Sequence, residues 1–308
     1  MDGVTDTVFR QIVVSVGRPD ALFTEFTSID GLLSAGKGET SKRLTFSNIE
    51  RPIVAQIWGS DPEKFYKAAQ LISKLGFDGI DINMGCPDNS TIKKGACAAL
   101  IKNPKLAKEI ILAAIKGAGG LPVSVKTRIG FDKIETGPWV KTLLSTPIAA
   151  LTLHLRTVPE MSRVPAHWEE IKKAVEIRNK VAPNTLIIGN GDVKSIQEAK
   201  RLCEQYKIDG VMIGTGIFEN VWLFNPGVNI EKVTPQQKIE LLIKHLALFQ
   251  ETYEDSKHFE LMKKFVKCYV NNFPRAVQVR DKLMKTKTLV ELIEAAVILR
   301  RLVEGSQD

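Results

Sequence analysis

Residues 83–100 read NMGCPDNSTIKKGACAAL, and this stretch says most about the fold and the chemistry of the chain. It follows the apolar run GIDIN of residues 79–83, which predicts a strand, and it leads through Gly and Ala toward a helix. Cys86 lies between Gly85 and Pro87. Cysteine most often packs as a small hydrophobic residue. Because Pro87 has no N–H for a central ladder and Gly85 adds backbone freedom, we instead expect Cys86 in a turn where its thiol meets a substrate.

Outward from this stretch, strand-like runs alternate with helical patterns up to about residue 220. Strands are predicted at residues 21–24, 53–58, 79–83, 123–127, 150–154, 185–189 and 210–213. The helices predicted between them include residues 62–75, 104–116, 168–181 and 195–206. Asp61 and Asn103 are N-cap candidates, each directly before a proline. Repeated strand then helix predicts parallel pairing through right-handed crossovers, and eight such units close a TIM (β/α)8 barrel.

The pattern changes after residue 228. From residue 234 onward no strand is recognisable, and apolar residues recur at helical spacing. Helices are predicted at residues 235–253, 258–271, 276–285 and 289–302. We therefore expect an α/β barrel domain over residues 1–228, followed by a C-terminal helical bundle over residues 234–308.

Composition and charge limit the class of protein. The chain has 308 residues, of which 44% are hydrophobic and 25% charged, as in globular proteins. It has neither an apolar run of about 18 residues nor a signal-peptide pattern, so a cytoplasmic enzyme is expected. The spacing of the four cysteines fits no zinc framework, and no metal site is expected.

The net charge of +8 makes polyanions plausible partners. Residues 257–287 hold nine basic residues against two acidic ones, Glu260 and Asp281. A solvated helix face is the alternative explanation for this excess. If a nucleic acid is the partner, we expect Lys263, Lys264 and Lys267 within this window to contact its phosphates.

Polar or glycine residues follow six of the predicted strands. In a parallel barrel, side chains at the carboxyl ends of the strands converge on one mouth, where active sites form. The residues at or just past these strand ends are Gln56, Asn83, Cys86, Lys126, Arg128, His154, Asn190, Asp192 and Gly214. This convergence predicts the active site.

The motifs around these residues resemble those of the tRNA-dihydrouridine synthases, in the family's order and over nearly the whole chain. Besides residues 83–100, the matching motifs are MDGVTD at 1–6 with FR at 9–10, AQI at 55–57 with Gly59, VKTRIG at 125–130, His154 with RT at 156–157, GNGD at 189–192 and MIG at 212–214. The resemblance implies bound FMN, NADPH as electron donor, and tRNA binding by the helical domain. The cofactor-binding residues it implies are Met1, Asp2, Gln56, Lys126, His154, Asn190, Gly191, Asp192, Gly214 and Thr215.

Some of these assignments have ordinary alternatives. Lys126 would supply a cation to the reduced flavin ring and Gln56 an amide, but a strand-end lysine also occurs as a surface residue. A lone histidine such as His154 is more often structural than catalytic. The family usually has arginine where this chain has Thr215, and a hydroxyl brings no charge to the flavin phosphate.

The expected reaction is reduction of a specific tRNA uridine to 5,6-dihydrouridine. Hydride would pass from the flavin to C6 of uracil, and Cys86 would protonate C5 as general acid. A cysteine acid must hold its proton, so it gains nothing from a depressed pKa. Asn83 and Arg128 are the candidates for holding the uracil edge. The alternatives are an FMN-dependent barrel oxidoreductase for a small pyrimidine such as dihydroorotate, and a tRNA-binding protein without chemistry.

One departure concerns the first strand of the barrel. In the family an apolar strand ending in Ala-Pro precedes the motif that matches residues 1–6, whereas this sequence starts at Met1. Unpaired edges of a barrel expose backbone donors and acceptors. We therefore expect either a start that is placed too late or a truncated chain, rather than a seven-stranded variant.

Overall fold

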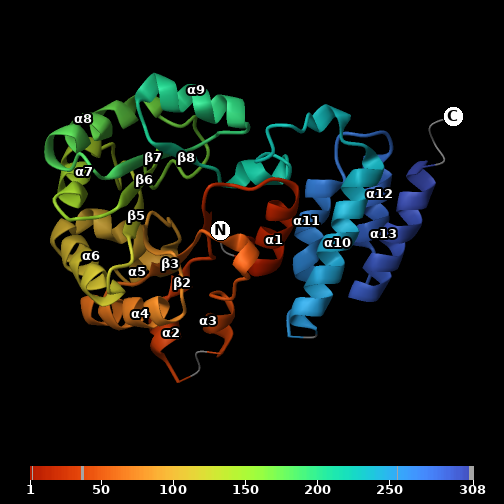
Figure 1. The fold of residues 1–308 in the computed structure, drawn as a ribbon, viewed down its shortest axis with the longest axis horizontal. Coiled ribbons are helices and arrows are strands. Elements are labelled where there is room, and N and C mark those ends of the chain that lie inside the picture. Colours follow the sequence, from red (N-terminus) through yellow and green to blue (C-terminus); the bar gives the residue numbers. More distant parts are fainter. Residues whose placement is uncertain (2, 36–37, 255, 305–308) are drawn as a thin grey trace. The chain divides into compact units, whose positions relative to one another are not determined.

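The structure is a computed structural model that describes residues 1, 3–35, 38–254 and 256–304 (Figure 1). Backbone contacts divide the chain into two compact units. The first unit comprises residues 1–2 and 20–214, and the second comprises residues 3–19 and 215–308.

The first unit is built on a parallel sheet. Its strands are β1 Leu22–Phe23, β2 Thr27–Ser28, β3 Ile53–Trp58, β4 Gly79–Met84, β5 Val123–Arg128, β6 Ala150–His154, β7 Leu186–Asn190 and β8 Gly210–Met212. They are ordered β1-β3-β4-β5-β6-β7-β8, with β2 also on β3, and every pair is parallel. Val54 of β3 pairs with Phe23 on one side and Gly79 on the other, and Ile57 pairs likewise with Thr27 and Ile82. β1 and β2 therefore share one position, which gives the seven strand positions predicted from the sequence.

Helices connect successive strands of this sheet. They are α2 Ile29–Leu33, α3 Gly38–Lys42, α4 Pro62–Lys74, α5 Asn89–Lys93, α6 Pro104–Ala118, α7 Thr136–Leu144, α8 Ile171–Val181 and α9 Ile196–Tyr206, with 3-10 turns η1 Asn48–Glu50, η2 Cys97–Lys102 and η3 Trp168–Glu170. The predicted caps are confirmed, because Asp61 accepts from the N–H groups of Glu63 and Lys64, and Asn103 accepts from that of Leu106.

Burial explains why the strands read as apolar runs. All six residues of β4 are buried, as expected for a parallel strand covered on both faces. α4 and α6 pack together and bury Phe65, Ile72, Ile110 and Ile111 completely. Figure 1 shows that α4, α6, α7, α8 and α9 lie around the outside of the strands. This is TIM-barrel architecture, and it places the carboxyl ends of the strands at one edge.

The second unit is helical. It contains α1 Thr7–Val16, α10 Pro235–Tyr253, α11 Glu260–Tyr269, α12 Ala276–Met284 and α13 Leu289–Glu304, with the short turns η4 Thr215–Phe218 and η5 Ile230–Lys232. The four predicted C-terminal helices are confirmed to within a few residues at their ends. No helix in the described ranges is long and apolar enough to cross a membrane.

The first helix belongs to this helical unit. α1 starts where Asp6 accepts from the N–H of Phe9 at 3.0 Å. The Phe9 ring lies 4.8 Å from that of Phe265 and 5.6 Å from that of His245, measured between centroids. α1 also packs on α10, as Figure 1 shows. The sequence-based boundary, with residues 1–228 in one domain, differs from this division because the apolar face of α1 is buried among the C-terminal helices.

Candidate active site

The turn that follows β4 is held by the side chain of Asn83. Its Oδ1 accepts hydrogen bonds from the N–H groups of both Gly85 and Cys86, each at 3.0 Å. Its Nδ2 donates to Oε1 of Gln56 at 3.1 Å. Because both backbone partners are donors, only this orientation of the carboxamide satisfies them. Asn83 is 7% exposed, so these buried bonds fix the backbone that carries the Cys86 thiol.

The carboxylate of Asp81 fixes the side chain of Gln56. Its Oδ2 accepts from Gln56 Nε2 at 2.7 Å, and its Oδ1 accepts from Ser124 Oγ at 2.6 Å. Asp81 is completely buried, which raises the pKa of its carboxyl, while the bonds from Ser124 and Gln56 act in the opposite direction. A chain of hydrogen bonds therefore runs from Asp81 through Gln56 and Asn83 to the turn.

Arg128 holds the same turn from the neighbouring strand. At the end of β5, its Nε donates to the carbonyl oxygen of Gly85 at 2.9 Å. Its Nη1 donates to the carbonyl oxygens of Thr157 at 2.8 Å and Met161 at 3.0 Å. Burial lowers the pKa of the guanidinium to about 10, so it remains a cation at neutral pH. Arg128 thus ties the Cys86 turn to the loop after β6, and within the described residues its Nη2 group makes no hydrogen bond.

Gly85 is required by a close approach between segments. A Cβ placed on it would lie 3.2 Å from both the carbonyl carbon and the Cα of Thr127. Such contacts with backbone are tighter than those of ordinary side chains, and the backbone of a central strand has little room to shift. The sequence suggested only conformational freedom for this glycine, whereas the structure adds a steric reason.

Cys86 has a second cysteine as its neighbour. All four cysteines are free thiols, and Cys86 is half-buried whereas Cys97 is fully buried. The N–H of Ala98 donates to the carbonyl oxygen of Cys86 at 3.3 Å, which brings the start of η2 against the turn. The Cys97 thiol is hydrogen-bonded to the Cys86 sulfur, and this bond lowers the pKa of Cys86 to about 6 against the opposing effect of burial. The pKa of Cys97 is raised by the same bond and by burial. Sequence reasoning missed this pair.

Lys126 places a cation near the carboxyl end of β5. It is half-buried on β5, and its ammonium makes no hydrogen bond or ion pair within the described residues. Burial and the charge of Arg128 lower its pKa to about 8, while Asp81 and Cys86 oppose that shift. A desolvated cation without a protein partner fits an anionic or electron-rich ligand group. This observation supports the flavin-binding role predicted for Lys126.

His154, at the end of β6, is neutral. Nη1 of Arg156 lies 3.3 Å from its Nε2. Since arginine only donates, Nε2 accepts and the ring proton resides on Nδ1. Burial lowers the pKa of His154 to about 2, and the charges of Lys126, Arg128 and Arg156 add to that effect. His154 is therefore a half-buried Nδ1–H donor between three cations.

The segment after β7 is largely occupied by internal bonds. Asn190 Nδ2 donates to the carbonyl of Met212 at 2.9 Å, which joins β7 to β8. The Asp192 carboxylate accepts from Arg156 Nη2 at 2.6 Å and from the N–H of Ala166 at 2.9 Å. These contacts hold the Asn190 and Asp192 side chains within the protein, and their predicted role at the cofactor stays a prediction. The backbone N–H groups of this turn are further candidates for a phosphate.

Gly191, Gly214 and Met1 lie at the carboxyl ends of β7 and β8. Gly191 has φ +142°, and a Cβ on it would lie 2.7 Å from the Cβ of Ala166. The Sδ atom of Met1 lies 4.0 Å from the position of a Cβ on Gly214, so Met1 lies beside the end of β8. Asp2, also predicted to bind the cofactor, lies outside the described residues. Thr215 begins η4 and is counted with the helical unit.

The predicted RNA-binding lysines differ in their surroundings. Lys264 and Lys267 are exposed on α11, three residues apart and hence on one helix face. Lys263 instead donates from Nζ to the carbonyl of Thr286 at 2.8 Å and to Glu260 at 3.1 Å, and its side chain is 13% exposed. Lys263 therefore ties α11 to the segment after α12, and its charge is largely used within the protein.

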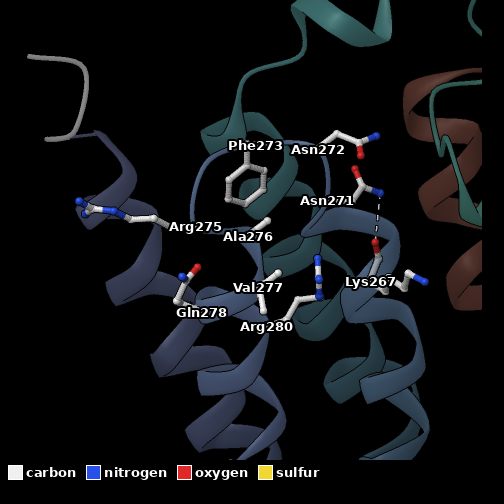
Figure 2. A pocket seen from close by; sticks show the side chains of 9 residues that line it. All are labelled: Lys267, Asn271, Asn272, Phe273, Arg275, Ala276, Val277, Gln278 and Arg280. Carbon is white, nitrogen blue, oxygen red and sulfur yellow. Dashed lines mark hydrogen bonds between the residues drawn. The ribbon is translucent and has the colours of Figure 1, made fainter.

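Lys267 also borders a basic groove in the helical unit (Figure 2). The groove is lined by Lys267, Asn271, Asn272, Phe273, Arg275, Ala276, Val277, Gln278 and Arg280. The Asn271 amide donates to the carbonyl of Lys267 at 3.1 Å, and Arg280 Nη1 donates to that of Val270 at 2.7 Å. Among the described residues, no cluster of three or more His, Cys, Asp or Glu side chains could hold a metal ion.

Comparison with known proteins agrees with this arrangement. A family profile described as "Dihydrouridine synthase (Dus)" matches residues 1–303. A "Probable tRNA-dihydrouridine synthase" of Staphylococcus aureus is 44% identical over 294 residues, covering 94% of this chain and 88% of the relative. A "Probable tRNA-dihydrouridine synthase 2" of Bacillus subtilis is 43% identical over 295 residues, covering 95% and 90%. A solved structure of a variant of NCR from Zymomonas mobilis has a TM-score of 0.47 at 17% identity, covering 72% of this chain and 81% of that one, and is too distant to add to the assignment. The motifs at the strand ends and the match over almost the whole length have one explanation: the chain belongs to the dihydrouridine synthase family.

Proposed function

We propose that this protein reduces a uridine of tRNA to 5,6-dihydrouridine, with FMN as bound cofactor, NADPH as electron donor and Cys86 as proton donor. Family membership supports the reaction. The single observation that carries the assignment of the site is the hydrogen-bond chain from Asp81 through Gln56 and Asn83 to the Cys86 turn. A buried polar chain of this kind holds a reactive side chain in one geometry, which general acid catalysis requires.

The charged side chains at the carboxyl ends of the strands suit a bound flavin. Lys126 is the desolvated cation for the electron-rich side of the ring, and His154 offers its Nδ1–H. Gln56 has spent one N–H on Asp81 and one acceptor site on Asn83, which leaves one N–H for the cofactor. With Thr215 in place of a cation, phosphate binding would rest on backbone N–H groups near Gly191 and Gly214. When bound, reduced FMN supplies the hydride for C6 of uracil.

Cys86 completes the reduction by giving its proton to C5 of uracil. The S–H bond breaks, the C5–H bond forms, and the negative charge moves to sulfur. The interaction with Cys97 stabilises the thiolate that results and lowers the pKa of Cys86 to about 6, contrary to the expectation of a thiol that holds its proton. Only the protonated fraction of Cys86 would act as the acid at neutral pH. Arg128, through its Nη2 group, is the donor we propose for a uracil carbonyl. The primary role of Asn83 is to position the turn.

The helical unit would hold the RNA. A uridine must leave its stack to be reduced, which costs a few kcal/mol and calls for an independent grip on the phosphates. Lys264, Lys267 and the groove of Figure 2 supply exposed positive charge for that purpose. We propose that the enzyme acts in the cytoplasm, where tRNA is its substrate.

The test uses Cys86→Ala with purified protein and unmodified tRNA. The variant should bind FMN and oxidise NADPH as the wild type does, while dihydrouridine formation measured by nucleoside mass spectrometry falls by roughly 10²–10⁴-fold. Cys203→Ser, at a half-buried position on α9, is the matched control and should keep full activity. Undiminished turnover of Cys86→Ala would refute the acid assignment. Reduction or oxidation of free dihydroorotate, with no activity on tRNA, would refute the proposed substrate.

A further inference from the structure

Cys86 and Cys97 are eleven residues apart in the sequence but adjacent in the structure. Their two backbones are joined by a hydrogen bond from the N–H of Ala98 to the carbonyl oxygen of Cys86 at 3.3 Å, and the Cys97 side chain is the largest cause of the lowered pKa of Cys86. Thr91 of α5 lies between the two segments. Its hydroxyl donates to the carbonyl oxygen of Asp88 at 2.8 Å, and its carbonyl accepts from the N–H of Ala96 at 3.1 Å. The two thiols are thus held together by contacts on both sides.

Cys97 occupies an unusual backbone conformation. Its φ is +53°, in the left-handed region that glycine enters freely and that is unfavourable for residues with a Cβ. Its side chain is fully buried and touches no solvent. Burial alone would be served by glycine, which adopts this backbone conformation without strain. A thiol held here against Cys86 at an energetic cost indicates that the sulfur itself has a use.

We propose that Cys86 and Cys97 are a redox couple, which a peroxide converts to an intrachain disulfide that removes the proton donor and which a dithiol reductant restores. The effect on activity rests on the function proposed above, whereas formation of the disulfide does not. The couple would protect Cys86 from irreversible oxidation and stop tRNA reduction for as long as peroxide persists.

The chemistry balances in two steps. The Cys86 thiolate attacks one oxygen of hydrogen peroxide, which forms a sulfenic acid and releases hydroxide. The Cys97 thiol then attacks the Cys86 sulfur, the S–O bond breaks, the S–S bond forms and water leaves. Two thiols are oxidised by two electrons in total, and one peroxide becomes two waters. The S–S bond that forms has a length of about 2.05 Å.

The other two cysteines do not share these properties. Burial raises the pKa of Cys268 to about 12, and burial together with Asp209 and Glu204 raises that of Cys203. Cys86 is the half-buried thiol of the four whose pKa is lowered, so it is the one that peroxide should reach as a thiolate. The order of attack follows, with Cys86 reacting first and Cys97 resolving.

Peptide mapping tests the bond directly. The full-length protein is treated with hydrogen peroxide, its remaining thiols are alkylated under denaturing conditions, and trypsin is added. Trypsin cuts at Lys93 and Lys94, so Cys86 and Cys97 fall on separate peptides, residues 75–93 and 95–102. We expect these two peptides to be found linked, and to separate on reduction with dithiothreitol. If Cys86 instead accumulates as sulfinic acid while Cys97 remains alkylated, the redox couple is refuted.

Activity measurements with three proteins test the consequence. In the wild type, and in Cys203→Ser as control, peroxide should lower dihydrouridine formation by roughly 10²-fold or more, and dithiothreitol should restore it. In Cys97→Gly, which suits the positive φ, the loss should not be reversed, because Cys86 without a resolving thiol proceeds to sulfinic acid. A linked peptide pair that leaves activity unchanged would refute the switch. A reduced wild type that forms the disulfide but never reduces tRNA would instead refute the proposed function.

Discussion

Nε of Arg128 donates to the carbonyl oxygen of Gly85 at 2.9 Å, so a residue on β5 fixes the turn in which β4 presents Cys86. Arg128→Lys tests this relationship. Lysine keeps the charge but cannot reach the Gly85, Thr157 and Met161 carbonyls at once from a planar fork. We expect FMN binding to persist and kcat on tRNA to fall by roughly 10–10²-fold, because the proton donor is no longer held in place.

The matched control for this change is Arg201→Lys, which alters an exposed arginine on α9 and should change neither quantity. Steady-state kinetics with tRNA and flavin absorbance after gel filtration are the two measurements. A variant that loses FMN together with activity would indicate a role in cofactor binding rather than in holding the turn.

The pH dependence of the reaction should follow the Cys86 thiol. The acid works in its protonated form, and the pKa of Cys86 is lowered to about 6. Activity should therefore be present below that pH and decline as pH rises through it. In Cys97→Gly the stabilising hydrogen bond is gone, so the decline should move to higher pH.

Alkylation of Cys86 by iodoacetamide gives an independent check, because only the thiolate reacts. Its rate should rise through about pH 6 in the wild type and at higher pH in Cys97→Gly. Identical profiles for the two proteins would mean that Cys97 does not act on Cys86.

Gly85→Ala should destabilise the protein. Its Cβ would press on the backbone of Thr127, and overpacking of this kind costs about 1–3 kcal/mol. Gly137→Ala on α7 is the matched control, since no atom lies within 4 Å of a Cβ placed there and alanine favours helix by about 1 kcal/mol. Chemical denaturation should show opposite signs for the two changes, and equal effects would argue against the close approach at Gly85.

Substitutions at Lys264 and Lys267 should affect RNA binding, whereas a substitution at Lys263 on the same helix should affect stability. Lys264→Glu with Lys267→Glu should weaken tRNA binding and reduce the slope of log affinity against log salt by roughly 0.7–0.9 for each lost phosphate contact. Lys263→Gln should mainly lower stability, because Lys263 bonds Thr286 and Glu260. Lys180→Glu, exposed on α8, controls for the change in net charge. An unchanged salt slope in the double variant would mean that this face is merely solvated.

Much of the fold could be predicted from the sequence because apolar periodicity and the capping, glycine and proline residues at element ends are local signals. β3 and β6 have the predicted bounds, and the Asp61 and Asn103 caps are where the prolines suggested. α1 escaped prediction because its sequence, TVFRQIVVSV, is rich in β-branched residues with modest helix propensity. Its helical form depends on burying Phe9 and its neighbours among helices far along the chain, which no local pattern reveals.

In the candidate site, too, positions could be predicted from the sequence but contacts could not. The residues that converge at the strand ends could be named from their positions, but what each side chain does depends on partners across the sheet. Asn83 was expected on the uracil edge, and its oxygen is spent on the Gly85 and Cys86 N–H groups. Asp192 was expected at the cofactor, and its carboxylate bonds Arg156. Cys97 went unnoticed because its place beside Cys86 depends on the path of the chain through residues 87–96, which the sequence does not display.

The neutral state of His154 has a consequence for acid conditions. Histidine is usually the side chain whose charge follows physiological pH, yet here burial, reinforced by three neighbouring cations, lowers its pKa to about 2. The groups at this edge that titrate near neutrality are then Cys86, at about 6, and Lys126, at about 8. Both are proposed to act in their protonated forms, so catalysis should fade in two steps on the alkaline side. The acid limit should come from unfolding, since below about pH 6.5 the unfolded chain binds a proton that folded His154 refuses.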